Sequence, residues 1–211
     1  MYNVYMRLGR RFRRSRLLRL AWCLLGAAVG LATALSVTGL SHSPLLLASL
    51  GGSSVFLFGL TRAPATQPRS LFGGHLAGAA IGIVCYRWLG ESVSSYALAT
   101  MLTLAFMLLA RAVHPPAGAN PILMIHAHAG WAQLWQPVLL GVGALAAVAA
   151  LWSRLLPGLC RYPLAWAVPS PERFDWGGWE DTQPLLEPMT DAGVGGAADP
   201  VETPSVGSHR I

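Results

Sequence analysis

The side chains best suited to hold a small charged species form two short clusters in the sequence. One is Gly51-Gly52-Ser53-Ser54, which offers bare backbone amides and hydroxyl groups of the kind that cradle an oxyanion. The other begins at His114-Pro115-Pro116 and continues through Gly118 to Asn120, combining a titratable imidazole with amide donors. A helix that starts with proline inside the protein would aim free N–H groups at an anion. The alternative is that Pro-Pro and Gly-Gly only kink helices.

His75 is a third candidate, because it follows Gly74 in a Gly74-x-x-x-Gly78-x-x-x-Gly82 series. On a helix these residues share one face, and small residues at this spacing favour tight packing against a neighbouring helix. His75 should therefore point into a helical bundle. An ionisable group at such a place is a functional candidate, although a histidine that only bonds a neighbour's carbonyl is nearly as good an interpretation.

Two arginines could supply positive charge beside these clusters. Arg69 precedes His75 on the same predicted helix, and Arg111 lies three residues before His114. Both could attract anions, or they could reflect membrane topology alone. Arg111 is the stronger candidate because it lies nearer to the second cluster.

Enzymatic and metal chemistry find little support in the sequence. Glu91 is the only carboxylate between residues 20 and 153, and no GxSxG, HExxH, Walker or GxGxxG pattern occurs. His126 and His128 fall on different faces of a helix, without a cysteine or an acidic partner nearby in the sequence, so they predict no metal site. We therefore expect no catalytic residues, no cofactor and no metal: the protein is predicted not to be an enzyme.

Composition indicates what must position these residues. Of 211 residues, 54% are hydrophobic and only 11% are charged, against about 25% charged in soluble domains. All basic residues are arginine, and seven of them precede residue 20, which leaves a long central block nearly free of charge. A nucleic-acid partner is not expected, because such proteins need a basic face on a folded domain.

The apolar runs predict an all-α polytopic membrane protein with four long spans plus two broken or re-entrant segments. The expected spans are Ala21 to Leu40, Leu71 to Trp88, Tyr96 to Ala110 and Pro137 to Trp152. The broken segments are Pro44 to Leu60, interrupted at Gly51 to Ser54, and Val113 to Trp131, which opens with the His-Pro-Pro sequence. Broken helices are tolerated in a membrane only where protein or a water-filled cavity satisfies the backbone.

Arginine distribution favours six crossings over four. Residues 1–19 are predicted to be a cytoplasmic anchor, and six crossings in residues 20–155 place most loop arginines on the same side. A four-span arrangement with two re-entrant segments remains the alternative. Residues 156–211 are rich in proline, glycine and acidic residues and are predicted to be a disordered tail.

The membrane block also contains an internal similarity. Gln67-Pro68 and Gln136-Pro137 each open a helix rich in small residues, and a His-x-Pro element precedes each of them, at His42 and at His114. Two halves of three crossings each would form a 3+3 inverted repeat, the architecture of many secondary transporters.

Three stretches carry a resemblance to a known family. They are Gly51-Gly-Ser-Ser-Val-Phe-Leu-Phe-Gly59, Pro64-Ala-Thr-Gln-Pro-Arg-Ser-Leu-Phe-Gly-Gly-His75 and Ala110-Arg-Ala-Val-His-Pro-Pro-Ala-Gly-Ala-Asn120. Over about residues 17 to 155 the chain resembles the HPP family of integral membrane proteins, described as having four membrane helices. Some members are associated with nitrite transport, so the resemblance implies a transporter or channel for a small monovalent anion, with nitrite as the first candidate.

The expected partners are therefore the lipid bilayer and a small inorganic anion, and the glycine-rich helices could also mediate homo-oligomerisation. The expected location is the bacterial inner membrane, with multiple crossings and the N-terminus in the cytoplasm. The alternative function is a non-transporting membrane scaffold or sensor that recruits a partner through its tail.

Overall fold

The computed structural model describes residues 15–39, 48–156, 159–167 and 169–170, and all regular structure within them is helical, as predicted. The elements are α2 (Arg16–Thr38), α3 (Ala48–Gly59), the 3-10 helix η2 (Pro64–Thr66), α4 (Pro68–Leu89), α5 (Val93–Leu109), the 3-10 helix η3 (Pro115–Ala119), α6 (Asn120–His126), α7 (Trp131–Gln133), the π-helix η4 (Leu134–Leu140) and α8 (Gly141–Trp152). His42-Ser43-Pro44 lies outside the described residues.

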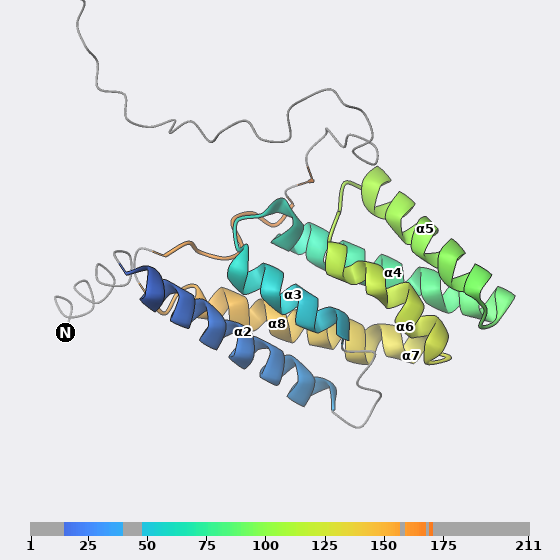
Figure 1. Cartoon of the computed structure of the whole chain (residues 1–211), viewed down its shortest axis with the longest axis horizontal. Helices are drawn as coiled ribbons and strands as arrows, with labels where there is room; N and C mark the ends of the chain where they lie inside the picture. Colours follow the sequence, from blue (N-terminus) through green and yellow to red (C-terminus); the bar gives the residue numbers. More distant parts are fainter. Residues whose placement is uncertain (1–14, 40–47, 157–158, 168, 171–211) are drawn as a thin grey trace, which may run out of the picture. The chain divides into compact units, whose positions relative to one another are not determined.

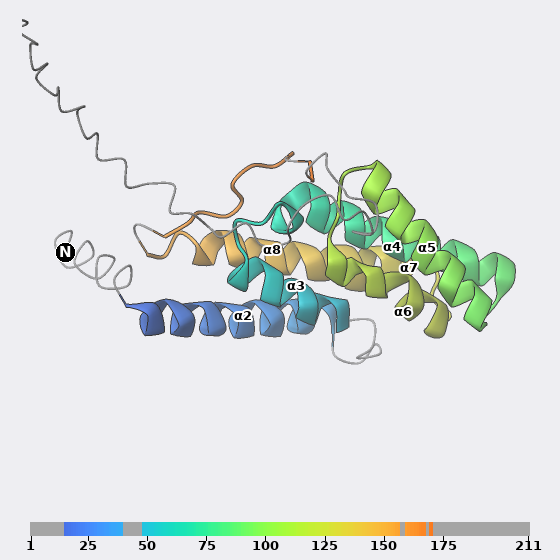
Figure 2. The ribbon, with the colours of Figure 1, turned by 45° about the horizontal axis from the view of Figure 1, so that its top comes forward.

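The long helices lie side by side and successive segments run in alternating directions (Figures 1 and 2). Helix α2 packs against α8 and α3, whereas α4 packs against α5 and α6. Helix α3 and the η3–α6 segment also touch, so the two segments predicted to be broken meet inside the helical region. This meeting is what positions the candidate site.

Two described helices are long and apolar enough to cross a membrane: Arg16–Thr38 and the continuous helix Trp131–Trp152. Helices α3 and α5 are apolar but shorter. Helix α4 has 22 residues, but its glycines and its polar residues lower its mean hydropathy. The prediction of four long spans is therefore met only in part.

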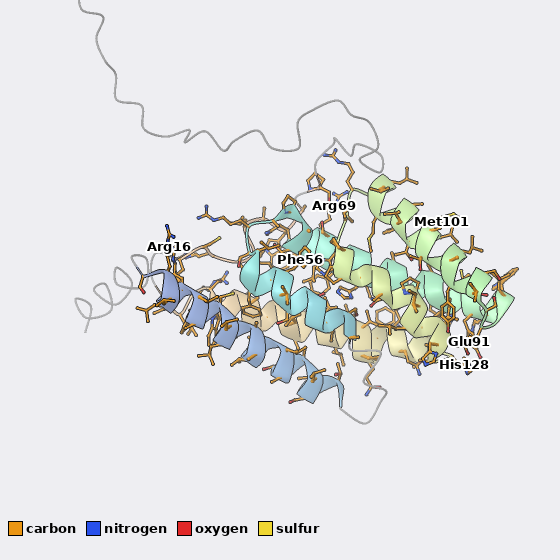
Figure 3. All side chains as sticks on the ribbon, viewed as in Figure 1. Arg16, Phe56, Arg69, Glu91, Met101 and His128 are labelled. Atoms are coloured by element: carbon orange, nitrogen blue, oxygen red, sulfur yellow. The ribbon has the colours of Figure 1, made fainter. Side chains whose placement is uncertain are left out.

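Helix α5 carries polar residues inside and apolar residues outside. Its buried face includes Ser95 and Thr103, while Met101 is 57% exposed and Leu109 is 77% exposed. Figure 3 shows Met101 on the outer side of α5. A surface of this kind is unfavourable in water but is compatible with lipid, where the apolar side chains remain in an apolar medium.

The prediction that Gly51 to Ser54 interrupts a helix is wrong. Helix α3 runs continuously from Ala48 to Gly59 through all four residues. Two consecutive glycines lower helix propensity by about 1 kcal/mol each, but the packing of buried Leu50 and Leu57 against α2, α4 and α8 offsets this cost. The backbone N–H groups of Ser53 and Ser54 therefore belong to the helix, and only their hydroxyls are available for other contacts.

The two Gln-Pro sequences are not equivalent in structure. Gln67-Pro68 starts α4, with Gln67 as its N-cap and Pro68 in the first turn. Pro137, in contrast, lies inside the helix that begins at Trp131, within the π-helical turn η4. Proline lacks an N–H and clashes with the carbonyl four residues earlier, and a wider π turn accommodates both defects. The last span accordingly begins at Trp131 and not at Pro137.

The glycine series of α4 allows the η3–α6 segment to lie directly on the helix. A Cβ on Gly74 would be 3.1 Å from His114 Cβ, and one on Gly82 would be 2.6 Å from Pro121 Cα. His75 is buried, at 1% exposure, as its place in the series predicts. The series thus brings the segment after His-Pro-Pro into backbone contact with α4.

The packed region extends beyond residue 155, where the tail was predicted to begin. Tyr162 is 1% exposed and belongs to the core formed by α2, α3, α4 and α8, where burial raises the pKa of its hydroxyl. The Leu164 N–H donates to Gln67 Oε1 over 2.9 Å, and the Val113 N–H donates to Ser170 Oγ over 3.0 Å. Residues 171–211 lie outside the described structure.

We expect Gly82→Ala to destabilise the protein, by about 1–3 kcal/mol, because the new methyl group would overlap the backbone of Pro121. The matched control is Gly143→Ala in α8, where nothing lies within 4 Å of the added Cβ and where alanine is the better helix former. Thermal unfolding of both variants in detergent should show a lower midpoint for Gly82→Ala alone. Equal midpoints would contradict the close approach of α4 and α6.

Candidate anion site

Three segments that are distant in sequence meet at the hydroxyl group of Ser53. Ser53 Oγ lies 2.8 Å from His75 Nε2 on α4 and 2.8 Å from His114 Nε2 in the His-Pro-Pro segment. The two imidazole ring centroids are 5.1 Å apart. Ser53 and His114 are 0% exposed and His75 is 1% exposed. We call these three side chains the His-Ser-His cluster; it is closed to solvent in this conformation.

His114 is held by the loop between α3 and α4. Its Nδ1 atom lies 2.6 Å from the carbonyl oxygen of Ala65, and its ring meets Phe56 edge-on, with centroids 5.8 Å apart. The backbone of His114 is extended. Pro115 disfavours helical backbone at His114, the residue before it, and its own fixed φ starts η3. The His-Pro-Pro sequence thus fixes where the imidazole is presented.

His75 is held on its other side by Asn120. Asn120 Nδ2 donates to the carbonyl oxygen of His75 over 2.9 Å and lies 3.0 Å from His75 Nδ1. The amide cannot be flipped, because its oxygen would then face the carbonyl oxygen. Asn120 is 1% exposed, and its Oδ1 atom has no hydrogen-bond partner. An acceptor is therefore available beside His75.

These contacts determine the tautomers of both histidines when they are neutral. Since Asn120 donates to His75 Nδ1, the proton of His75 is on Nε2 and points to Ser53. Since His114 Nδ1 faces the carbonyl of Ala65, its proton is on Nδ1, and its Nε2 accepts from the Ser53 hydroxyl. All of these hydrogen bonds therefore run in one direction: Asn120 donates to His75, His75 to Ser53, Ser53 to His114, and His114 to the carbonyl of Ala65.

The remaining predicted site residues lie around the cluster without joining it. Ser54 Oγ donates to the carbonyl of Ala27 on α2 over 3.0 Å. A Cβ on Gly52 would be 3.0 Å from Pro116 Cβ, so this glycine allows α3 and η3 to approach each other. Next to this contact, Gly51 and Gly118 have open space where a Cβ would be.

The two candidate arginines bond to backbone carbonyls. Arg69 Nη2 donates to Ala110 O over 2.9 Å, and Arg111 Nε donates to Ser170 O over 3.1 Å. Arg111 also adopts a positive φ of 50°. Both side chains thus help to shape the chain before His114.

Glu91, Tyr96, His126 and His128 form a second polar cluster, at the end of α4 remote from Arg69 (Figure 3). Glu91 Oε2 accepts from His128 Nε2 over 2.7 Å, and Glu91 Oε1 accepts from His126 Nδ1 over 3.2 Å and from the Tyr96 hydroxyl. These bonds, with that of Tyr96 strongest, lower the pKa of Glu91 from 4.5 to about 2.

The sequence did not indicate this cluster, because Glu91 lies 35 residues before His126 and 37 residues before His128. His128 has a positive φ of 48°, so its side chain does not follow the helical spacing that placed the histidines on different faces. Nothing in the sequence singled out Ala65 either, because it bonds to His114 only through its backbone carbonyl, which every residue type has. Among the described residues, no group of three histidine, cysteine or acidic side chains is arranged to hold a metal ion.

The fold and the His-Ser-His cluster define an integral membrane protein with lipid-compatible outer faces and a closed polar centre. The family model for the HPP transmembrane region matches residues 12–163, so the chain belongs to the HPP family. Two curated relatives, each named only as a transmembrane protein of Dictyostelium discoideum, are 30% identical over 135 residues and 31% identical over 120 residues.

The first alignment covers 57% of this chain and 45% of the relative, and the second covers 53% and 39%. The chain thus spans less than half the length of these relatives. No solved structure matches this chain.

We expect ¹⁵N NMR of histidine-labelled protein in nanodiscs at neutral pH to show one buried histidine protonated at Nε2, assigned to His75, and another protonated at Nδ1, assigned to His114. The signals are assigned with His75→Gln and His114→Gln. An Nε2 proton on neutral His114 would contradict the direction of the hydrogen-bond chain.

We also expect the Glu91 carboxyl to titrate at about 2. Because its pKa is lowered on folding, its bonds stabilise the protein above the ordinary pKa of 4.5, and this contribution is lost as the pH falls through about 2. Tyr96→Phe should raise the midpoint more than His126→Ala, as measured by ¹³C NMR with Glu91→Gln for assignment. A wild-type midpoint near 4.5 would refute the cluster.

Proposed function

We propose that this protein is a transporter or channel for a small monovalent anion, with nitrite as the first candidate, and that the His-Ser-His cluster is its binding site. The observation that carries the proposal is the convergence of two imidazole Nε2 atoms on one oxygen position, 2.8 Å from each. Ionisable and polar groups are costly inside a membrane and usually mark a substrate pathway.

The chemistry of the site favours an anion over a cation. Glu91 is the only carboxylate in the described part of the chain, and it lies in the loop between α4 and α5, away from the cluster. When both Nε2 atoms carry protons, they form a pair of donors directed at one point. An oxyanion oxygen would occupy the position of Ser53 Oγ once the serine side chain rotates away from the two Nε2 atoms.

The contact between α3 and η3 is the place where a path for the ion would open. It consists of Gly52 against Pro116, where a Cβ on Gly52 would be 3.0 Å from Pro116 Cβ. Separation of α3 from η3 at this contact is consistent either with rocking of two halves or with channel-like passage.

The arrangement of helices supports six crossings. Because successive segments alternate in direction (Figures 1 and 2), the loops that carry Arg62 and Arg111 and the start of α2 at Arg16 fall on one side. Glu91 falls on the other. The positive-inside rule then puts the arginine side, and the N-terminus, in the cytoplasm. The corresponding location is the bacterial inner membrane.

Packing also supports an inverted repeat. The pairs α2·α8 and α4·α5 would be equivalent under exchange of the two halves, as would the contacts α2·α3 and α5·α6. The point of exchange is the contact of α3 with η3, beside Ser53. The glycine series of α4 is occupied by the η3–α6 segment, so homo-oligomerisation would use other faces.

The test is an anion-flux assay with the full-length chain in lipid vesicles. Gradients of nitrite, nitrate and formate are applied separately, and we expect flux of at least one anion to fall more than tenfold in His114→Ala. The matched control is His126→Ala, which changes an exposed histidine outside the site and should leave flux within about twofold of wild type. Thermal midpoints show that both variants are folded.

If none of the three anions moves, transport of these ions is refuted and a non-transporting scaffold or sensor becomes the better account. If flux is present but His114→Ala leaves it unchanged, transport stands while the assigned site does not.

A further inference from the structure

The number of protons that the His-Ser-His cluster can hold suggests how transport is driven. In the neutral state described above, the hydroxyl of Ser53 donates to His114 Nε2 and accepts from His75 Nε2. Ser53 Oγ also lies 3.0 Å from the carbonyl oxygen of Ser49, one turn earlier on α3. A hydroxyl has one proton, so it cannot donate fully to both His114 and Ser49.

One added proton resolves this competition without any heavy atom moving. If His114 Nε2 becomes protonated, it donates to Ser53 Oγ, and the hydroxyl of Ser53 turns to donate to the carbonyl of Ser49. His75 Nε2 continues to donate to Ser53 Oγ. All of the polar atoms concerned keep a partner of the right kind, so the cluster accepts a first proton with its hydrogen bonds complete.

A second added proton would not find a nitrogen atom in the cluster that faces a hydrogen-bond acceptor. It would have to bind His75 Nδ1, which faces the N–H of Asn120 at 3.0 Å, and two donors would then oppose each other. His114 Nδ1 is already protonated toward Ala65 O. The geometry therefore limits the cluster to one additional proton, carried by His114.

The described residues around the cluster do not neutralise that proton. Among the described residues, α3 has no titratable side chain. On α4, the side chain of Arg69 donates to the carbonyl of Ala110, and Cys85, Tyr86 and Arg87 lie two or more helical turns beyond His75. On α5 and α6, the titratable side chains are Tyr96 and His126. Both of them bond to Glu91, at the end of α4 remote from Arg69. Arg111, which follows α5, bonds to Ser170. A single positive charge buried without a counter-charge is costly, and a monovalent anion bound beside His114 would remove that cost.

We propose that the protein carries its anion together with one proton, which binds at His114 Nε2 and is accommodated when the Ser53 hydroxyl turns to Ser49, so that the transported pair is electrically neutral. This inference rests on the proposed function. The proton is taken from water on one side, held on His114 while the anion is bound, and returned to water on the other side. By linkage the proton and the anion strengthen each other's binding, so anion affinity should rise about tenfold for each pH unit of acidification until His114 is protonated.

The first test measures coupling with the full-length chain in vesicles that contain a pH-sensitive dye, using nitrite, nitrate and formate gradients in turn. We expect an inward gradient of the transported anion to acidify the interior with one proton per anion. Potassium diffusion potentials of opposite sign should change the initial rate less than twofold. Protein-free vesicles report passive leakage of the free acids.

The matched variants are Ser53→Ala and Ser54→Ala. Both serines are buried on α3, but the hydroxyl of Ser54 donates to the carbonyl of Ala27 on α2 and not to a histidine. Ser54→Ala should keep the one-to-one ratio, whereas Ser53→Ala should reduce proton-coupled flux more than tenfold. A Ser53→Ala protein that retains the one-to-one ratio would overturn the role assigned to the Ser53 hydroxyl.

The second test follows the wild-type protein, with the histidine signals assigned by His75→Gln and His114→Gln, and does not depend on activity. Histidine ¹⁵N spectra recorded during acidification should show His114 gaining a proton at Nε2 while His75 Nδ1 stays unprotonated. Protonation of His75 first would overturn the assignment of the proton to His114. Anion flux that follows membrane potential without acidification would overturn coupling but leave the proposed function intact, whereas absence of flux for all three anions would overturn both.

Discussion

In a low-dielectric interior, a buried polar group must find a partner, because water is not there to supply one. The hydroxyl of Ser53 is the partner shared by His75 and His114, and through them α3, α4 and the His-Pro-Pro segment are joined at one point. Removing either histidine would leave the others with unmet bonds. This requirement explains why the two short segments, α3 and η3–α6, are held together in the middle of the helical region.

Close packing makes those hydrogen bonds possible. Gly74 and Gly82 let the segment from His114 to Pro121 lie on α4 at distances that a side chain would forbid, and Gly52 does the same for α3 and Pro116. The small residues therefore bring backbones together, and the polar side chains then reach each other with little freedom. Because interhelical attraction in lipid depends on van der Waals contact and on hydrogen bonds, the two features act together.

The His-Ser-His cluster also differs from a purely structural hydrogen-bond network. A purely structural hydrogen-bond network needs only one arrangement of donors and acceptors. The single hydroxyl proton of Ser53, in contrast, has two possible acceptors, His114 Nε2 and Ser49 O. Two hydrogen-bond patterns therefore fit the same heavy-atom positions and differ by one proton. Such a two-state element is what coupling of a proton to a ligand requires, and the proposed transport cycle depends on it.

The sequence by itself determined the membrane class, the helical content, the burial of His75 and the start of a new helix directly after His114. These follow from local properties: hydropathy, helical spacing and the backbone limits of proline. Only the tertiary structure decided that Gly51 to Ser54 continues a helix, that Pro137 lies within a π turn, and that Glu91 collects His126 and His128. Packing against distant segments overrides weak helix propensities. It likewise determines which of the polar residues meet, because hydrogen bonds between residues 53, 75 and 114 depend on positions in space that spacing along the chain does not encode.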